Sequence, residues 1–199
     1  MYLTDAILLC SYTIATLYVA ICTPLSSLAR TGLILLILAE MLWALFTNFT
    51  IRISPIKNLE INVNGFLLPT LFSISVLVLV VLEGFPVSIL LPLILFATLL
   101  SYVNSRIVER SGVMVPLAVH GLTSSALLSL IFKIFKCPIH LLPTIVPTTS
   151  IIGLAVVDVF IALRYGNMVL GGAGYKDALF ASLPITTSFA ILVKLLMTI

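Results

Sequence analysis

The sequence is poor in charge. Only 9% of its 199 residues are Asp, Glu, Lys or Arg, against about 25% in soluble domains. The ten Lys and Arg residues are scattered without a basic run, which argues against nucleic acid as a partner. A chain with so few polar residues cannot form a polar surface toward water. The composition therefore predicts that the protein is embedded in a lipid bilayer and that lipid is a partner.

Cysteine is equally scarce. Cys10 and Cys22 fall in the first apolar run and Cys137 stands alone, so there is neither a disulfide framework nor a zinc spacing. Cys137 and His140 make at most half a metal site, and two unrelated loop residues are the simpler explanation. We therefore predict no metal and no cofactor. The N-terminus carries Asp5 where a cleavable signal peptide has basic residues, so we interpret the first run as a retained anchor.

Long apolar runs dominate what is present, since 61% of the residues are hydrophobic. A helix needs about 20 such residues to cross the hydrocarbon core. Prolines inside these runs do not exclude helices, because neighbouring segments in a bilayer can satisfy the freed carbonyls. We predict an all-α integral membrane protein, one polytopic domain over 1–199, with seven transmembrane helices. The expected spans are 5–23, 32–49, 66–83, 86–104, 112–134, 144–164 and 176–198; the last connection and 144–164 form either a helix plus a loop or one broken helix.

Seven spans place the two termini on opposite faces of the membrane. The face with the N-terminus is expected to hold six basic residues and the other face four. Because basic residues concentrate in cytoplasmic loops, the N-terminus is predicted to be cytoplasmic and the protein integral to the cell membrane. The first set is Arg52, Lys57, Arg106, Arg110, Arg164 and Lys176; the second is Arg30, Lys133, Lys136 and Lys194.

The connection between the second and third spans differs from the others. Polar and apolar residues alternate over 49–54 and again over 59–64, and Pro55 to Asn58 between them is typical of a turn. We predict a short β-hairpin over about 49–64, with an irregular loop as the alternative. A short similarity in Asn and Gly positions links residues 62–65 with residues 167–172, and each segment precedes a predicted span. It is explained either by a repeated unit or by a chance match.

Ionisable residues inside apolar runs are the candidates for chemistry, because each costs about 2.5–3.5 kcal/mol at mid-membrane. The helical rise places Glu40 and His120 at depths of about 12 Å and Asp158 at about 9 Å. Asp177 opens the last span behind a turn with four nearby glycines. We expect Asp158 and Asp177 to approach each other near one membrane face.

Two carboxyl groups in a pocket of low polarity can divide the roles of acid and base and so activate water against a peptide bond. In this hypothesis Asp158 and Asp177 are catalytic, and Gly171, Gly172, Gly174 and Tyr175 shape the substrate site. The alternative is structural: Asp158 pairs with a nearby cation or amide, and Asp177 occupies a helix N-terminus, where the dipole favours an anion.

The segment Gly172 to Asp177 resembles the Gly-x-Gly-Asp motif of intramembrane aspartyl proteases, the presenilin, signal-peptide-peptidase and prepilin-peptidase group. The resemblance implies catalytic aspartates on helices six and seven, matching Asp158 and Asp177, and a membrane-protein or peptide substrate. Tyr175 and Lys176 are additional residues within the motif, and no later Pro-Ala-Leu motif follows.

From about residue 61 to the C-terminus the chain is also similar to a family of bacterial and archaeal multi-pass membrane proteins with a domain of unknown function. That resemblance implies a membrane protein and brings no activity. Its matching elements are Asn64-Gly65…Pro69, Ser101-Tyr102…Ser105-Arg106, Gly112-Val113…Val115-Pro116, Gly153…Asp158 and Gly171-Gly172-Ala173-Gly174…Asp177.

Two further functions are compatible with the sequence. In a proton- or cation-coupled transporter or channel, Glu40, His120 and Asp158 would form a relay through the bundle. The structural alternative for His120 is a hydrogen-bonded core histidine. In a non-enzymatic scaffold or assembly subunit, the hairpin would offer its edge to a partner strand.

Overall fold

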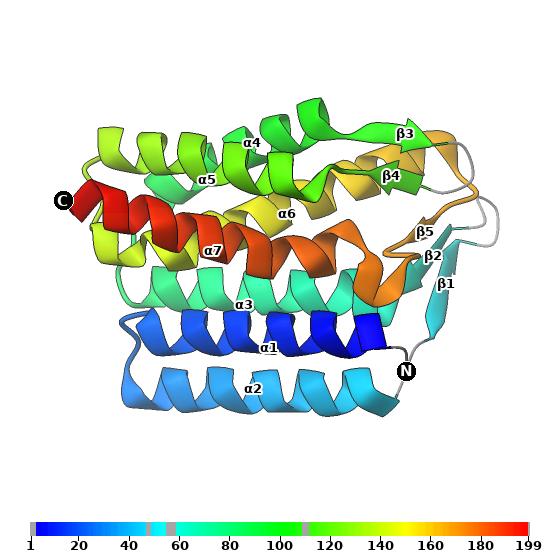
Figure 1. Cartoon of the computed structure of the whole chain (residues 1–199), viewed down its shortest axis with the longest axis horizontal. Helices are drawn as coiled ribbons and strands as arrows, with labels where there is room; N and C mark the ends of the chain where they lie inside the picture. Colours follow the sequence, from blue (N-terminus) through cyan, green and yellow to red (C-terminus); the bar gives the residue numbers. More distant parts are fainter. Residues whose placement is uncertain (1–2, 47–48, 55–58, 109–111, 199) are drawn as a thin grey trace.

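The computed structural model describes residues 3–46, 49–54, 59–108 and 112–198. Seven helices in this part are long and apolar enough to cross a membrane, so the predicted all-α, multi-span class is confirmed. The start of α1 and all the labelled strands lie at one end of the bundle, called the strand end below, and the end of α7 lies at the other (Figure 1). The helices are α1 Leu3–Cys22, α2 Ser27–Phe46, α3 Leu68–Leu82, α4 Val87–Asn104, α5 Leu117–Ile134, α6 Leu142–Tyr165 and α7 Ala178–Thr198.

Helix α6 is the centre of the bundle. Of the residues in its most apolar stretch 72% are buried, against 22% in α2 and in α4. Helices α3, α4, α5 and α7 pack around α6, whereas α2 packs on α1 and α3 at the edge of the bundle. The outer faces of the helices carry exposed Leu, Ile and Val side chains, which is the surface that hydrocarbon requires.

The predicted hairpin is present, and it is part of a larger sheet. Strands β1 (Thr50–Ser54) and β2 (Leu59–Asn62) pair antiparallel, with Ile51 opposite Ile61. The turn expected at 55–58 lies outside the described residues. Strand β5 (Val169–Leu170) pairs parallel with β2 and gives the order β1-β2-β5. The segments 62–65 and 167–172, linked by their Asn/Gly similarity, therefore lie beside each other.

The start of the fifth span differs from the prediction. Residues 112–116 were expected to be helical, but β4 (Gly112–Met114) pairs antiparallel with β3 (Arg106–Val108), and α5 begins only at Leu117. The reason is Pro116, which is the N-cap of α5 with an extended backbone. A proline also disfavours the helical conformation in the residue before it. The second span begins earlier than expected, at Ser27 rather than 32, because the backbone carbonyl of Ser26 accepts the N–H of Arg30.

The connection from α6 to α7 is a structured loop and not a continuation of either helix. Gly166 ends α6 with φ 65°, a left-handed conformation that glycine adopts without a steric penalty. The chain then forms β5 and a single 3₁₀ turn, η3 (Gly174–Lys176), before α7 begins. Of the two arrangements considered for this region, the helix plus loop is the one observed.

Candidate functional site

The Gly-rich turn is held against the start of the third span. There the chain forms a π-helical turn, η1 (Val63–Leu67), and the Oδ1 atom of Asn62 accepts the N–H of Gly65 at 2.8 Å. A Cβ atom on Gly65 would overlap the carbonyl oxygen of Gly171 and lie 2.9 Å from that of Gly174. The glycines are therefore required for a backbone-to-backbone contact that fixes the turn in place.

Asp177 is the N-cap of α7. Its backbone is extended, its carbonyl accepts the N–H of Ala181 at 2.9 Å, and its Oδ1 atom accepts the N–H of Leu179 at 3.1 Å. This is the geometry in which Asp stabilises a helix start. The structural role considered from the sequence is thus present.

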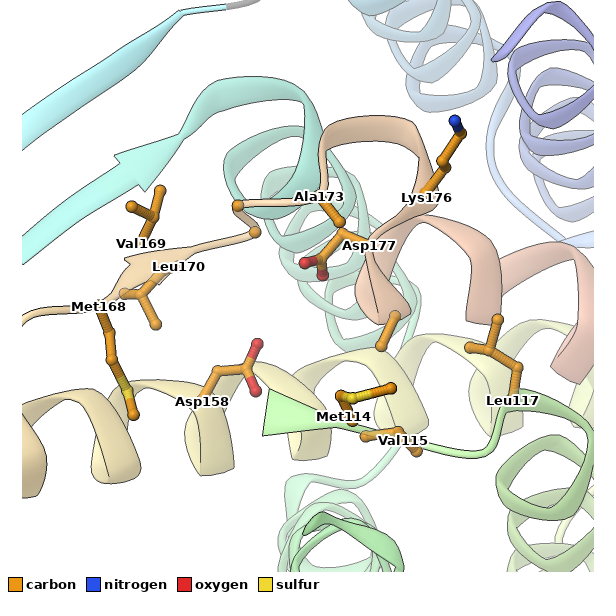
Figure 2. Close-up of a pocket in the computed structure, with 13 residues that line it drawn as sticks. Met114, Val115, Leu117, Asp158, Met168, Val169, Leu170, Ala173, Lys176 and Asp177 are labelled. Atoms are coloured by element: carbon orange, nitrogen blue, oxygen red, sulfur yellow. The ribbon is translucent and has the colours of Figure 1, made fainter. Parts of the chain in front are cut away.

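Asp158 reaches the same place from α6. The two carboxylates point into one cavity of about 310 Å³ at the strand end, called the acidic pocket below (Figure 2). Met168, Val169 and Leu170 line one side of it, and Met114 and Val115 line another. The volume is within the range of small-molecule and peptide-side-chain sites. The structure therefore brings together the two aspartates that the sequence singled out.

The pKa of Asp177 is displaced upward. Burial raises it from 3.8 to about 6, and hydrogen bonding to the N–H groups of Leu179 and Ala173 opposes part of the rise. No hydrogen bond joins the carboxyl groups of Asp158 and Asp177 in the described part of the chain, so they do not share a proton by direct contact. If the two groups act together on a substrate, one water must therefore be within hydrogen-bond reach of both carboxyl groups.

The remaining predicted site residues take different positions. Gly171 and Gly172 line the acidic pocket, whereas Gly174, with φ 60°, turns the chain behind it and accepts the N–H of Asp177. The side chain of Tyr175 lies outside the described part. Lys176 points away from the carboxylates in Figure 2, and its amine lies 3.7 Å from the carboxylate of Asp5 on α1.

Glu40 and His120 do not join the acidic pocket. His120 is fully buried on α5, and its Nε2 atom lies 3.0 Å from the hydroxyl of Ser150 on α6. Ser150 precedes Asp158 by about two turns, or about 12 Å along the helix. Glu40 is 5% exposed and lies near the hydroxyl of Tyr12 on α1, without hydrogen-bond geometry. Helices α2 and α5 lie at opposite edges of the bundle in Figure 1, so Glu40 and His120 belong to separate places.

Sequence reasoning missed the apolar walls of the acidic pocket. Met114, Val115 and Leu117 were assigned to the body of a helix, but Met114 ends β4, Val115 lies in the connection after it, and Leu117 is only the first residue of α5. Pro116 was the available signal, because a proline at this point favours an extended segment before a helix.

Within the described ranges, no cluster of three or more His, Cys, Asp and Glu side chains is placed to hold a metal ion.

These features define a class of protein: a multi-pass membrane helical bundle with small strands and an acidic pocket at one end. The family described as "Protein of unknown function (DUF1614)" matches residues 24–192, and the chain belongs to that family. The match covers five of the seven spans in full, α7 up to residue 192, and every residue of the acidic pocket. Comparison with curated proteins and with solved structures gives no match.

Proposed function

We propose that the acidic pocket hydrolyses a peptide bond in a membrane polypeptide. The observation that carries this proposal is the convergence of Asp158 and Asp177, from two different elements, on one cavity at the end of the bundle. Asp177, which is largely ionised at neutral pH with a pKa of about 6, takes the proton from the attacking water. Asp158 supplies the proton that the leaving amine needs when the C–N bond breaks.

The surroundings of the pocket suit an extended substrate. Strand β5 is at the edge of its sheet, and Val169 and Leu170 line the pocket beside the carboxylates. A polypeptide segment that adds to this edge as a further strand would present its peptide bonds in line with the pocket. A helical substrate must therefore unwind locally, which is easiest near the end of its membrane span.

The direct test uses the full chain reconstituted in lipid vesicles. Single-span reporter polypeptides, labelled at both ends, are incubated with the protein, and the products are identified by mass spectrometry. The proposal predicts cleavage near the end of the reporter span that lies at the strand end. A photoreactive peptide carrying a hydroxyl in place of the scissile carbonyl should label the segments that line the acidic pocket. Labelling confined to other segments would contradict the proposal.

The rate of cleavage is expected to depend on pH through Asp177. The base must be ionised, so the rate should rise with pH through about 6, and it should fall again at higher pH where Asp158 loses the proton that it must donate. A profile that is flat between pH 5 and pH 7, about one unit on either side of that pKa, would exclude Asp177 as the base.

Folding stability provides a second measurement of the ionisation of Asp177. Its contribution should fall with pH over the range in which the cleavage rate rises. The folded-state pKa lies above the unfolded value, so the fold disfavours ionisation. The contribution of Asp177 to stability should therefore be most favourable below about pH 4 and decrease as the pH rises to about 6. Asp177→Asn should lack this decrease when apparent melting temperatures are compared over the same range.

A further inference from the structure

A second cavity lies at the end of the bundle opposite the strands. Its volume is about 410 Å³, and three connections between helices form it. Its walls come from Thr23 and Pro24 after α1, from residues 83–86 between α3 and α4, and from residues between 135 and 141 before α6. Because these connections follow the ends of spanning helices, the cavity lies at the depth of lipid headgroups.

The lining of this headgroup-level cavity has two parts. Val80, Phe85 and Leu141 are buried apolar residues, whereas Glu83, Lys136 and His140 are exposed. A ligand that fits this lining has an apolar portion beside a headgroup with charges of both signs. Inorganic ions and simple sugars lack that combination.

The two opposite charges face the cavity without joining each other. Within the described ranges, no ion pair connects Glu83 to Lys136. The Oε1 atom of Glu83 accepts the backbone N–H of Ser26 at 2.7 Å, and this bond lowers the pKa of Glu83. The side chain is therefore anchored as a carboxylate that lines the cavity, and carboxylate oxygens can each accept more than one hydrogen bond.

The backbone at Lys136 is unusual for a lysine. Its φ is 53°, and the N–H of Cys137 closes the C-terminal end of α5 by bonding to the carbonyl of Phe132 at 3.0 Å. This motif usually has glycine at the left-handed position. A lysine here puts strain into the turn and places a cation at the mouth of the cavity, and strain of this kind is typical of ligand sites.

We propose that this cavity binds the headgroup of a phospholipid of the phosphatidylethanolamine type. Lys136 and His140 contact the phosphate, the carboxylate of Glu83 accepts a hydrogen bond from the primary ammonium, and the apolar residues contact the first part of the acyl chains. A phosphate held by a cation and an ammonium held by a carboxylate are both charge-assisted contacts. The site is independent of the acidic pocket, which lies at the other end of the bundle.

The test measures binding of short-chain lipids to the full chain in detergent, by the shift of its apparent melting temperature with lipid concentration. Phosphatidylethanolamine is compared with phosphatidylcholine and phosphatidylglycerol of the same chain length, and with free phosphoethanolamine. We expect phosphatidylethanolamine to bind at least tenfold more tightly than the other three. Phosphatidylcholine lacks a hydrogen-bond donor for Glu83, phosphatidylglycerol lacks the ammonium, and phosphoethanolamine lacks the acyl chains.

Two variants separate binding from folding. Lys136→Gly should raise the melting temperature of the lipid-free protein, because glycine fits the left-handed position, and yet weaken phosphatidylethanolamine binding at least fivefold. Glu83→Gln keeps the hydrogen bond to Ser26 and should abolish the preference over phosphatidylcholine. Lys133→Ala, at a lysine on the same helix end that does not line the cavity, is the matched control and should bind as wild type does.

Equal affinity for the three lipids, or wild-type affinity in Lys136→Gly, would overturn the proposal. Phosphoethanolamine binding as tightly as the lipid would instead assign the site to a soluble phosphate ester. Should Lys136→Gly fold poorly, Lys136→Asn provides the same loss of charge in a residue that tolerates the left-handed conformation.

Discussion

Replacing either Asp158 or Asp177 by Asn is expected to reduce cleavage of a membrane reporter by about 10²–10⁴-fold, the usual contribution of a positioned acid or base. Asn keeps the size of the side chain but cannot exchange the proton that the reaction requires. The double variant should be little worse than either single variant, because two groups that act on one water form a unit. Initial rates of product formation in vesicles are the measurement.

The double role of Asp177 makes its substitution informative. Asn is about as good an N-cap as Asp, so Asp177→Asn should preserve the start of α7 and fold normally. Its apparent melting temperature checks this, and a normally folded, inactive variant separates the chemistry from the cap. Asp5→Asn is the matched control: this carboxylate is also at the strand end, beside Lys176, but it does not line the acidic pocket. Full activity in Asp158→Asn would eliminate the paired-carboxylate hypothesis.

Gly65→Ala and Gly171→Ala are expected to be the most destabilising alanine substitutions at the strand end. A Cβ atom on Gly171 would lie 2.5 Å from the backbone nitrogen of Phe66, and the φ of Gly171 is 68°. The obstacle is backbone on both sides, which cannot rotate away as a side chain can. Overpacking costs about 1–3 kcal/mol and a left-handed alanine about 1–2 kcal/mol more. We therefore expect a loss of about 3 kcal/mol in the unfolding free energy of Gly171→Ala, measured by denaturant titration in detergent.

Gly32→Ala is the control for these variants. It lies on α2, and apart from the neighbouring backbone of its own helix no atom lies within 4 Å of the position of an added Cβ, so the substitution should be neutral or slightly stabilising. Unchanged stability in both Gly65→Ala and Gly171→Ala would show that the turn and η1 do not pack as described. If either variant loses cleavage activity as well as stability, the Gly-rich turn acts as a structural support that positions Asp177.

The spans could be predicted because hydropathy is a local property of the sequence, and it alone largely decides whether a segment enters the bilayer. Each apolar run is long enough to cross, and lipid allows few alternatives to a helix. The hairpin was predictable for a similar reason, since alternation over 49–54 and 59–64 is also local. The start of α5 was missed because the apolar run continues through Pro116, and hydropathy does not distinguish an apolar strand from a helix.

The pairing of β5 with β2 could not be predicted, because it joins segments more than 100 residues apart through the backbone. Two residues, Val169 and Leu170, carry no alternation. The contact between Gly65 and Gly171 is similarly invisible, since each glycine is ordinary in its own segment. The short similarity of 62–65 and 167–172 did mark the two places that meet, although a repeated unit and a chance match both explain it.

Asp158 could be selected from the sequence because a carboxylate in an apolar helix is costly and needs a reason. Asp177 could be selected only under two hypotheses, a helix cap and a catalytic group. The structure shows the cap, and it also places the carboxylate in the lining of the acidic pocket. Glu40 and His120 met the same criterion as Asp158, but helix packing places them apart. The depth of a residue is local information, whereas its neighbours depend on the whole bundle.

The most direct measurement is the position of ordered water in the acidic pocket, by an experimental structure of the protein in lipid near pH 6. A paired acid and base predict one water within about 3 Å of an oxygen of both Asp158 and Asp177. Two separate hydration sites, with the carboxylates more than about 10 Å apart and no water common to both, would contradict the account.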